Sequence, residues 1–220
     1  MSIDLYYMSG SAPCRLVLLV AAALDIQMNL HPVNLREGEQ FKPEFLKLNP
    51  QHTVPTIVDD GFSLWESRAI SRYLVNKYGG ETTLYPKDPQ QRALVDQRLD
   101  FDLGTLYPRF AQYFVSFLHE HKLEEALVFL NTFLDGHKYA AGDQLTLSDL
   151  SLVATVSTID VAVINYTHKI LKQFGTRHPL DKIDKYCDIQ QKYGVSSLNT
   201  FRVTISNCTP LMSIREFHAN

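Results

Sequence analysis

Cysteine, tryptophan and long apolar runs are all scarce in this sequence. The 220 residues include three cysteines, at positions 14, 187 and 208, and a single tryptophan, Trp65. Cysteines this far apart match neither a zinc-ligand pattern nor a disulfide framework, so we expect no metal site. Few cysteines without a disulfide pattern are typical of a reducing compartment, and we therefore expect a cytoplasmic location.

Signals for membranes and nucleic acids are also missing. The longest apolar stretch, LVLLVAAALDI at residues 16–26, is too short to cross a bilayer, which takes about 20 residues. The N-terminus lacks the basic and apolar regions of a signal peptide. The 21 Lys and Arg residues are mixed with 24 Asp and Glu residues, giving a net charge of -3. This balance favours neither a nucleic acid nor an anionic membrane as partner.

The composition that is present is that of a globular protein, with 45% hydrophobic and 20% charged residues. A chain of this length forms one large domain or two small ones. Its first eighty residues predict the order β-α-β-α-β-β-α, a small α/β layer. The predicted elements are a strand at 3–8, a helix from Pro13, an edge strand at 28–35, a short helix at 42–50, a hairpin turning at Asp60-Gly61 and an amphipathic helix at 66–78.

The remainder of the chain predicts helices. Turn-forming residues at 81–90 indicate a linker between a domain at 1–80 and an all-helical domain at 91–220. Pro108 interrupts an aromatic stripe at helical spacing, so we expect a kink or break there. A second helix ends at Gly136, and a third begins with a capping box formed by Thr146 and Asp149. Beyond about residue 165 the patterns weaken, with helical patches near 179–192.

The turn SGSAPCR at residues 9–15 is the first candidate for chemistry, because it ends a strand and opens a helix. Its Ser11-x-x-Cys14 spacing is that of a C-x-x-C redox turn whose first cysteine is replaced by serine. Free N–H groups at a helix N-terminus favour an anion there, such as a thiolate. Ser11 is also simply the expected N-cap, and Cys14 reads as a buried, inert thiol. Ser9 could have a purely structural role in the turn.

Two further segments carry weaker signals. Val54-Pro55 precedes a strand, and a cis bond there would turn the Val54 backbone outward to pair with an extended peptide. Glu66-Ser67-Arg68 opens a helix, where Ser67 could cap, the free N–H groups could hold a carboxylate and Glu66 could take an ammonium group. Each has a plain alternative: a trans proline at a strand start, and an ordinary helix start.

Together these segments resemble a known family. The stretches YYMSGSAPCR, NPQHTVPTIVDDGFSLWESRAISRYL and FLNTFLDGHKYAAGDQLTLSDLSLVATVST look like cytosolic glutathione transferases of the insect delta and epsilon classes, nearer delta, over residues 3–165. The resemblance implies a thioredoxin-like N-terminal domain followed by a helical-bundle domain, a homodimer, and a role in xenobiotic detoxification. It also implies that the cofactor is glutathione, acting as co-substrate.

The resemblance also implies site residues. Ser11 matches the catalytic serine. The glutathione contacts carried over are Leu35, Gln40, His52, Val54, Pro55, Glu66, Ser67, Arg68 and Asp102. Val54 would pair its backbone with the cysteinyl part, His52 would face the glycine end, and Arg68 and Asp102 would serve the γ-glutamyl end. An electrophile pocket would be lined by Pro13, Tyr107, Phe110 and Phe114, although a stripe of this kind is more often core.

Three departures from the family pattern stand out. Gln40 occupies a position where many delta members have histidine. The segment VSFLHEHKLEEAL between two helices is shorter than usual, and residues 175–220 do not follow the family's last helix with its tryptophan.

The predicted function is conjugation of the glutathione thiolate to hydrophobic electrophiles, with reduction of organic hydroperoxides as a further activity. Three alternatives stay open: a weakly active or inactive protein that binds glutathione or apolar ligands, a thiol-disulfide oxidoreductase using Cys14, and a structural module of a larger assembly. The serine at position 11 argues against the oxidoreductase.

Overall fold

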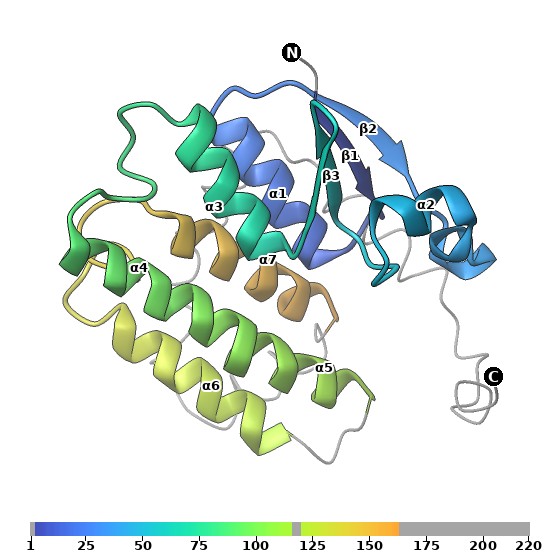
Figure 1. The fold of residues 1–220 in the computed structure, drawn as a ribbon. Coiled ribbons are helices and arrows are strands. Elements are labelled where there is room, and N and C mark those ends of the chain that lie inside the picture. Colours follow the sequence, from blue (N-terminus) through green and yellow to red (C-terminus); the bar gives the residue numbers. More distant parts are fainter. Residues whose placement is uncertain (1–2, 116–119, 163–220) are drawn as a thin grey trace.

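The computed structural model describes residues 3–115 and 120–162 (Figure 1). The N-terminal half contains a four-stranded mixed sheet with three helices. Its elements are β1 (Ile3–Tyr7), α1 (Ala12–Ala23), β2 (Met28–Pro32), the 3-10 turns η1 (Leu35–Glu37) and η2 (Glu39–Phe41), α2 (Pro43–Leu48), β3 (Thr56–Asp59), β4 (Phe62–Trp65) and α3 (Ser67–Tyr78). The predicted β-α-β-α-β-β-α order and the thioredoxin-like fold class are confirmed.

The strands lie in the order β2-β1-β3-β4. β1 and β2 are parallel, β3 is antiparallel to β1, and β4 is antiparallel to β3. The predicted edge position of the strand containing Pro32 is confirmed. Asp60 and Gly61 join β3 to β4 with φ of 51° and 80°, as the predicted type I′ hairpin turn requires.

The two faces of the sheet differ. Ile3, Leu5 and Ile57 are fully buried on the face that α1 and α3 cover, whereas α2 lies over the opposite face (Figure 1). The ring of Phe45 in α2 meets Tyr6 edge-on at 5.8 Å on that opposite face. Successive side chains of β1 therefore point alternately into the core and toward the face that α2 covers.

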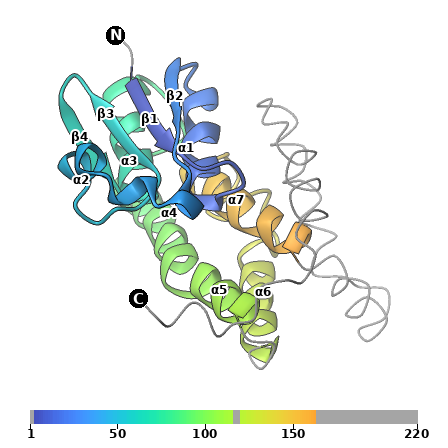
Figure 2. The same cartoon turned by 90° about the vertical axis from the view of Figure 1, so that its right-hand side faces the viewer.

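The helical half is built from α4 (Pro89–Phe101), η3 (Asp102–Leu106), α5 (Tyr107–Val115), α6 (Glu120–Phe133) and α7 (Leu147–Ala162). α4 begins at Pro89 because Asp88 caps it, accepting a hydrogen bond from the Gln91 N–H at 2.9 Å. The helix therefore starts inside the predicted linker. α7 contacts α1 and α4, and lies where the two halves meet (Figure 2).

Pro108 causes an irregularity, although not a break. η3 is a π-helical turn in which the Tyr107 N–H bonds to the Asp102 carbonyl. A proline ring clashes with the carbonyl four residues earlier, and the wider turn relieves this ahead of Pro108. The extra residue also shifts the helical register. Leu103, which helical spacing in the sequence would put on the same stripe as Tyr107 and Phe110, is 47% exposed.

The Asp149 half of the predicted capping box of α7 is confirmed, while the Thr146 hydroxyl donates to the Asp149 carboxylate at 2.8 Å. Asp149 accepts hydrogen bonds from the Thr146 N–H at 2.8 Å and from the Ala140 N–H at 2.9 Å. Gly136, with φ of 74°, follows α6 as predicted. The predictions for residues 163–220, including the helical patches near 179–192, lie outside the described residues.

Candidate functional site

The segments singled out from the sequence meet at one edge of the sheet. The carboxyl ends of β1, β2 and β4 lie at this edge together with the start of β3, because these three strands run parallel and β3 runs against them. The edge carries four features in this order: the turns after β2, Ser11 after β1, Val54 before β3 and Glu66 after β4. Three inter-strand spacings amount to about 14 Å. An extended tripeptide reaches about 10 Å between its backbone ends, so it can lie along this edge.

Ser11 lies near the middle of the edge as the N-cap of α1, as predicted. Its Oγ accepts a hydrogen bond from the Cys14 N–H at 3.4 Å. Accepting this bond uses a lone pair and leaves the hydroxyl proton available for donation. The Cys14 side chain is 1% exposed, and burial raises the pKa of its thiol despite the nearby Ser11 hydroxyl. Cys14 is thus a packing residue rather than a nucleophile.

The loop before β3 is organised by Asn49, which the sequence analysis did not identify. Its fully buried amide donates to the Thr53 carbonyl at 2.9 Å and to the Thr56 hydroxyl at 3.0 Å. The Val54-Pro55 peptide bond in this loop is cis. Asn49 precedes Pro50, and an Asn-Pro pair, which marks turns and loops, is the sequence signal that could have indicated a structured loop here.

The start of α3 differs from the expected cap. Glu66 occupies the N-cap position with φ of 70° and makes no side-chain capping bond, so the prediction that Ser67 caps the helix is wrong. Ser67 is the first helical residue and is buried, whereas Glu66 is exposed. Because no side chain accepts a hydrogen bond at this cap, the first N–H groups of α3 are open to an external acceptor.

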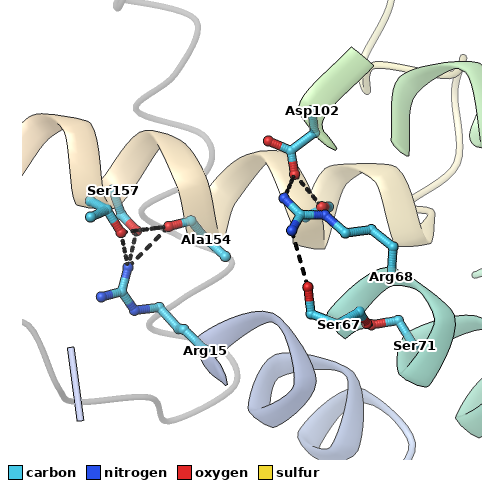
Figure 3. A network of polar contacts seen from close by, with 9 residues as sticks. Arg15, Ser67, Arg68, Ser71, Asp102, Ala154 and Ser157 are labelled. Atoms are coloured by element: carbon cyan, nitrogen blue, oxygen red, sulfur yellow. Dashed lines mark hydrogen bonds and ion pairs between the residues drawn. The ribbon is translucent and has the colours of Figure 1, made fainter. Parts of the chain in front are cut away.

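Behind Ser67 lies a buried polar network, drawn in Figure 3. The Arg68 guanidinium donates to the Ser67 Oγ at 3.0 Å and to the Asp102 carboxylate at 2.6 Å. Ser151 of α7 also donates to this carboxylate, in a very short hydrogen bond. Among the described residues, Arg68 Nε and Asp102 Oδ1 have no hydrogen-bond partner. Arg68 and Asp102 are therefore brought together, but beneath Ser67 and away from solvent.

The other end of the edge carries Leu35, Gln40 and His52. The Gln40 amide nitrogen donates to the Leu35 carbonyl at 3.4 Å. The ring of Phe41, the residue after Gln40, lies 4.9 Å from the exposed imidazole of His52. These contacts bring the segment that carries Leu35 and Gln40 next to the loop that carries His52.

The predicted electrophile residues divide into two groups. Tyr107 is half-buried, with its ring centroid 5.7 Å from the Arg68 guanidinium carbon, and burial raises the pKa of its hydroxyl. Pro13 lies in the first turn of α1 beside Ser11. Phe110 is 8% exposed and belongs to the core, 6.3 Å from the Tyr107 ring. Phe114 is in α5, but its side chain lies outside the described residues.

Residues 3–115 and 120–162 form neither a metal-binding cluster nor a membrane-spanning helix. No group of three or more His, Cys, Asp or Glu side chains there could hold a metal ion. None of the helices in these ranges is both long and apolar enough to span a membrane.

Comparison with known proteins decides the family. Residues 5–82 match the family model of the glutathione S-transferase N-terminal domain. A delta-class glutathione transferase of Nilaparvata lugens has a similar solved structure, with a TM-score of 0.81 and 41% sequence identity over 94% of this chain and 100% of that chain. The chain belongs to the glutathione transferase family. The resemblance noted from the sequence, to insect delta and epsilon class enzymes, is thereby confirmed.

Other glutathione transferases are also similar. Isozyme E7 of Drosophila melanogaster shares 36% identity over 93% of this chain and 96% of that chain, with a TM-score of 0.77. A glutathione transferase homologue of Drosophila mojavensis, solved with bound glutathione, shares 30% identity over 94% of this chain and 97% of that chain, with a TM-score of 0.78.

Proposed function

We propose that this glutathione transferase joins the glutathione thiolate to hydrophobic electrophiles, with Ser11 holding the sulfur as an anion. The observation that carries the proposal is the position of Ser11. It caps α1 in the middle of an edge that is long enough for an extended tripeptide. The cis Val54-Pro55 bond and the open start of α3 lie on the same edge.

Each part of glutathione then has a partner along this edge. Exposed Glu66 takes the α-ammonium group of the γ-glutamyl residue, and the open N–H groups at the start of α3 take its carboxylate. The backbone of Val54 pairs with the cysteinyl residue, as in an added strand. Leu35, Gln40 and His52 meet the glycyl end. Arg68 and Asp102 act from behind, by holding Ser67 in place.

The chemical role of Ser11 follows from the acidity of thiols. A free thiol has a pKa of about 8.5, so it is mostly protonated at neutral pH. A hydrogen bond from the Ser11 hydroxyl and the positive end of α1 both favour the thiolate. The sulfur lone pair then forms a carbon–sulfur bond while the leaving group departs with its bonding electrons.

Organic hydroperoxides are a second class of substrate for the same thiolate. The sulfur takes the terminal oxygen of the hydroperoxide, and the oxygen–oxygen bond breaks to release the alcohol after protonation. A second glutathione then forms the disulfide and releases water. Both reactions need an apolar substrate held beside the sulfur, and we assign this role to half-buried Tyr107 and to Pro13, two residues after Ser11.

We also propose that the protein is a homodimer in the cytosol. Phe62, Leu94 and Leu103 expose 49%, 44% and 47% of their surface, which is high for large apolar side chains. A dimer interface that covers them would remove this apolar area from water.

The test of the proposal is the variant Ser11→Ala. We expect kcat/KM with 1-chloro-2,4-dinitrobenzene to fall about 10²-fold or more, as for loss of one donor to a developing anion. The pKa of bound glutathione, followed by the ultraviolet absorbance of the thiolate, should rise. Loss of the N-cap costs about 1 kcal/mol, so the variant should still fold.

Ser9→Ala is the matched control, because Ser9 is an exposed serine in the same turn. It should change neither the rate nor the thiol pKa. An unchanged pKa of bound glutathione in Ser11→Ala would reject the role of Ser11. Glutathione binding without turnover of any electrophile would instead indicate a binding protein.

A further inference from the structure

The segment at the glycyl end of the site is short of positive charge. Residues 34–44, NLREGEQFKPE, contain two basic and three acidic side chains, a net charge of -1. The Lys42 ammonium group is engaged by Glu39 at 2.8 Å, and the other carboxylate oxygen of Glu39 accepts the Asn34 N–H at 2.7 Å. A ligand carboxylate arriving here therefore meets no surplus of cations on this segment.

Gln40 is the polar side chain of this segment whose interactions are least satisfied. Its amide nitrogen has one long bond, to the Leu35 carbonyl at 3.4 Å, and keeps a second N–H for a ligand. Its Oε1 is buried and has no hydrogen-bond partner among the described residues. A buried acceptor left without a partner weakens the folded state. Gln40 is thus poorly explained by stability, which points to a role toward the ligand.

A neutral amide donor discriminates little between ligand end groups. It can donate to a carboxylate or to the carbonyl oxygen of an amide or ester. A charged donor would favour the carboxylate by about tenfold, since hydrogen bonds between charged groups are the stronger ones.

We propose that Gln40 makes this site tolerant of γ-glutamylcysteinyl thiols whose C-terminal group is neutral, such as glutathione amide. Gln40 is then the specificity-determining residue at this end of the site. The inference rests on the proposed function, because it assumes that a glutathione-like thiol lies along the edge of the sheet.

The experiment measures kcat/KM for glutathione and for its glycinamide analogue with the same aryl halide. In the unmodified protein we expect the two values to agree within about threefold. Gln40→Glu should lower the value for glutathione about tenfold or more, by repulsion between carboxylates, and change the value for the amide much less. Gln40→Lys should raise the preference for glutathione over the amide about tenfold.

Gln27→Glu is the matched control. It makes the same charge change at an exposed glutamine before β2, about 17 Å away along the strand from the end that leads to Gln40. It should leave the ratio of the two thiols unchanged.

Two results would overturn the inference. One is a more than tenfold preference of the unmodified protein for glutathione over the amide. This measurement does not depend on whether any variant folds. The other is a Gln40→Glu variant that changes both thiols by the same factor. Absence of turnover with either thiol would reject the proposed function itself, and this inference with it.

Discussion

At the scale of single residues, the arginine–aspartate pair behind Ser67 matters most for the site. Arg68 and Asp102 are 7% and 0% exposed, so each charge depends on the other for its stabilisation. Arg68, held by Asp102, in turn donates a hydrogen bond to Ser67, the first residue of α3, and so fixes its side chain. Breaking a buried pair costs more than the pair contributes, because it leaves an uncompensated charge in the interior.

Asp102→Asn tests this arrangement, because it keeps the shape of the side chain and removes the charge. We expect the free energy of unfolding to fall by about 3–5 kcal/mol, and KM for glutathione to rise as Ser67 loses its anchor. Urea unfolding and steady-state kinetics measure the two effects. Glu81→Gln breaks the exposed Lys87–Glu81 pair instead and should change neither quantity. A cost for Asp102→Asn no larger than for this control would contradict the prediction.

At the scale of elements, Asp59 joins the end of β3 to the last turns of α3. Its carboxylate accepts hydrogen bonds from the hydroxyls of Tyr73 at 2.6 Å and Tyr78 at 2.7 Å, and from the Lys77 ammonium group at 2.8 Å. Burial pushes the pKa of Asp59 upward, but the three donors outweigh it and hold the pKa below its usual value. The ionised form is therefore the one that ties strand to helix.

The stability of this contact should depend on pH. An Asp whose pKa is lowered by folding stabilises the protein above its unfolded pKa of about 3.9, and loses this as the pH falls through the lower folded value. We expect the difference in unfolding free energy between the unmodified protein and Asp59→Asn to be constant from about pH 8 to 5 and to shrink below about pH 4. Urea titrations at several pH values measure it. A difference that grows on acidification would contradict the sign.

At the scale of the whole molecule, Arg15 connects the two halves. From α1 its buried guanidinium donates to the Ala154 carbonyl at 3.1 Å and to the hydroxyls of Ser157 at 2.8 Å and Thr158 at 2.9 Å, all on α7 (Figure 3). Together with the contact between Arg68 and Asp102, this places charged hydrogen bonds across the boundary between the sheet half and the helices. We therefore expect the halves to unfold together.

Arg15→Ala should separate their unfolding. Trp65, the single tryptophan, lies in β4 and reports on the sheet half by fluorescence, while circular dichroism is dominated by the helices. Coincident transitions in the unmodified protein should become distinct in Arg15→Ala, with about 2–4 kcal/mol of stability lost through the missing bonds and side chain. Arg98→Ala removes an arginine bond to the Ala140 carbonyl within the helical half, and should leave the transitions coincident. Coincident transitions in Arg15→Ala would refute the coupling.

The sequence by itself determined the elements, their order and the family. The features that carried this information join residues only a few positions apart, so they can be recognised in the sequence alone. They are the strand and helix periodicities, the Asp60-Gly61 turn, the Ser11 cap and the capping box at Asp149. The Ser11 turn, Val54-Pro55 and Glu66-Ser67 likewise indicated the edge of the sheet where we propose the site.

Only the tertiary structure decided how the site is supported. Arg68 meets Asp102 across 34 positions, Asp102 meets Ser151 across 49, and Arg15 meets Ala154 across 139. No local pattern encodes such partners, because the same residue types would suit a solvated surface equally well. The strain around Pro108 was visible in the sequence, but whether the helix breaks or widens depended on the packing of α4 and α5 against their neighbours.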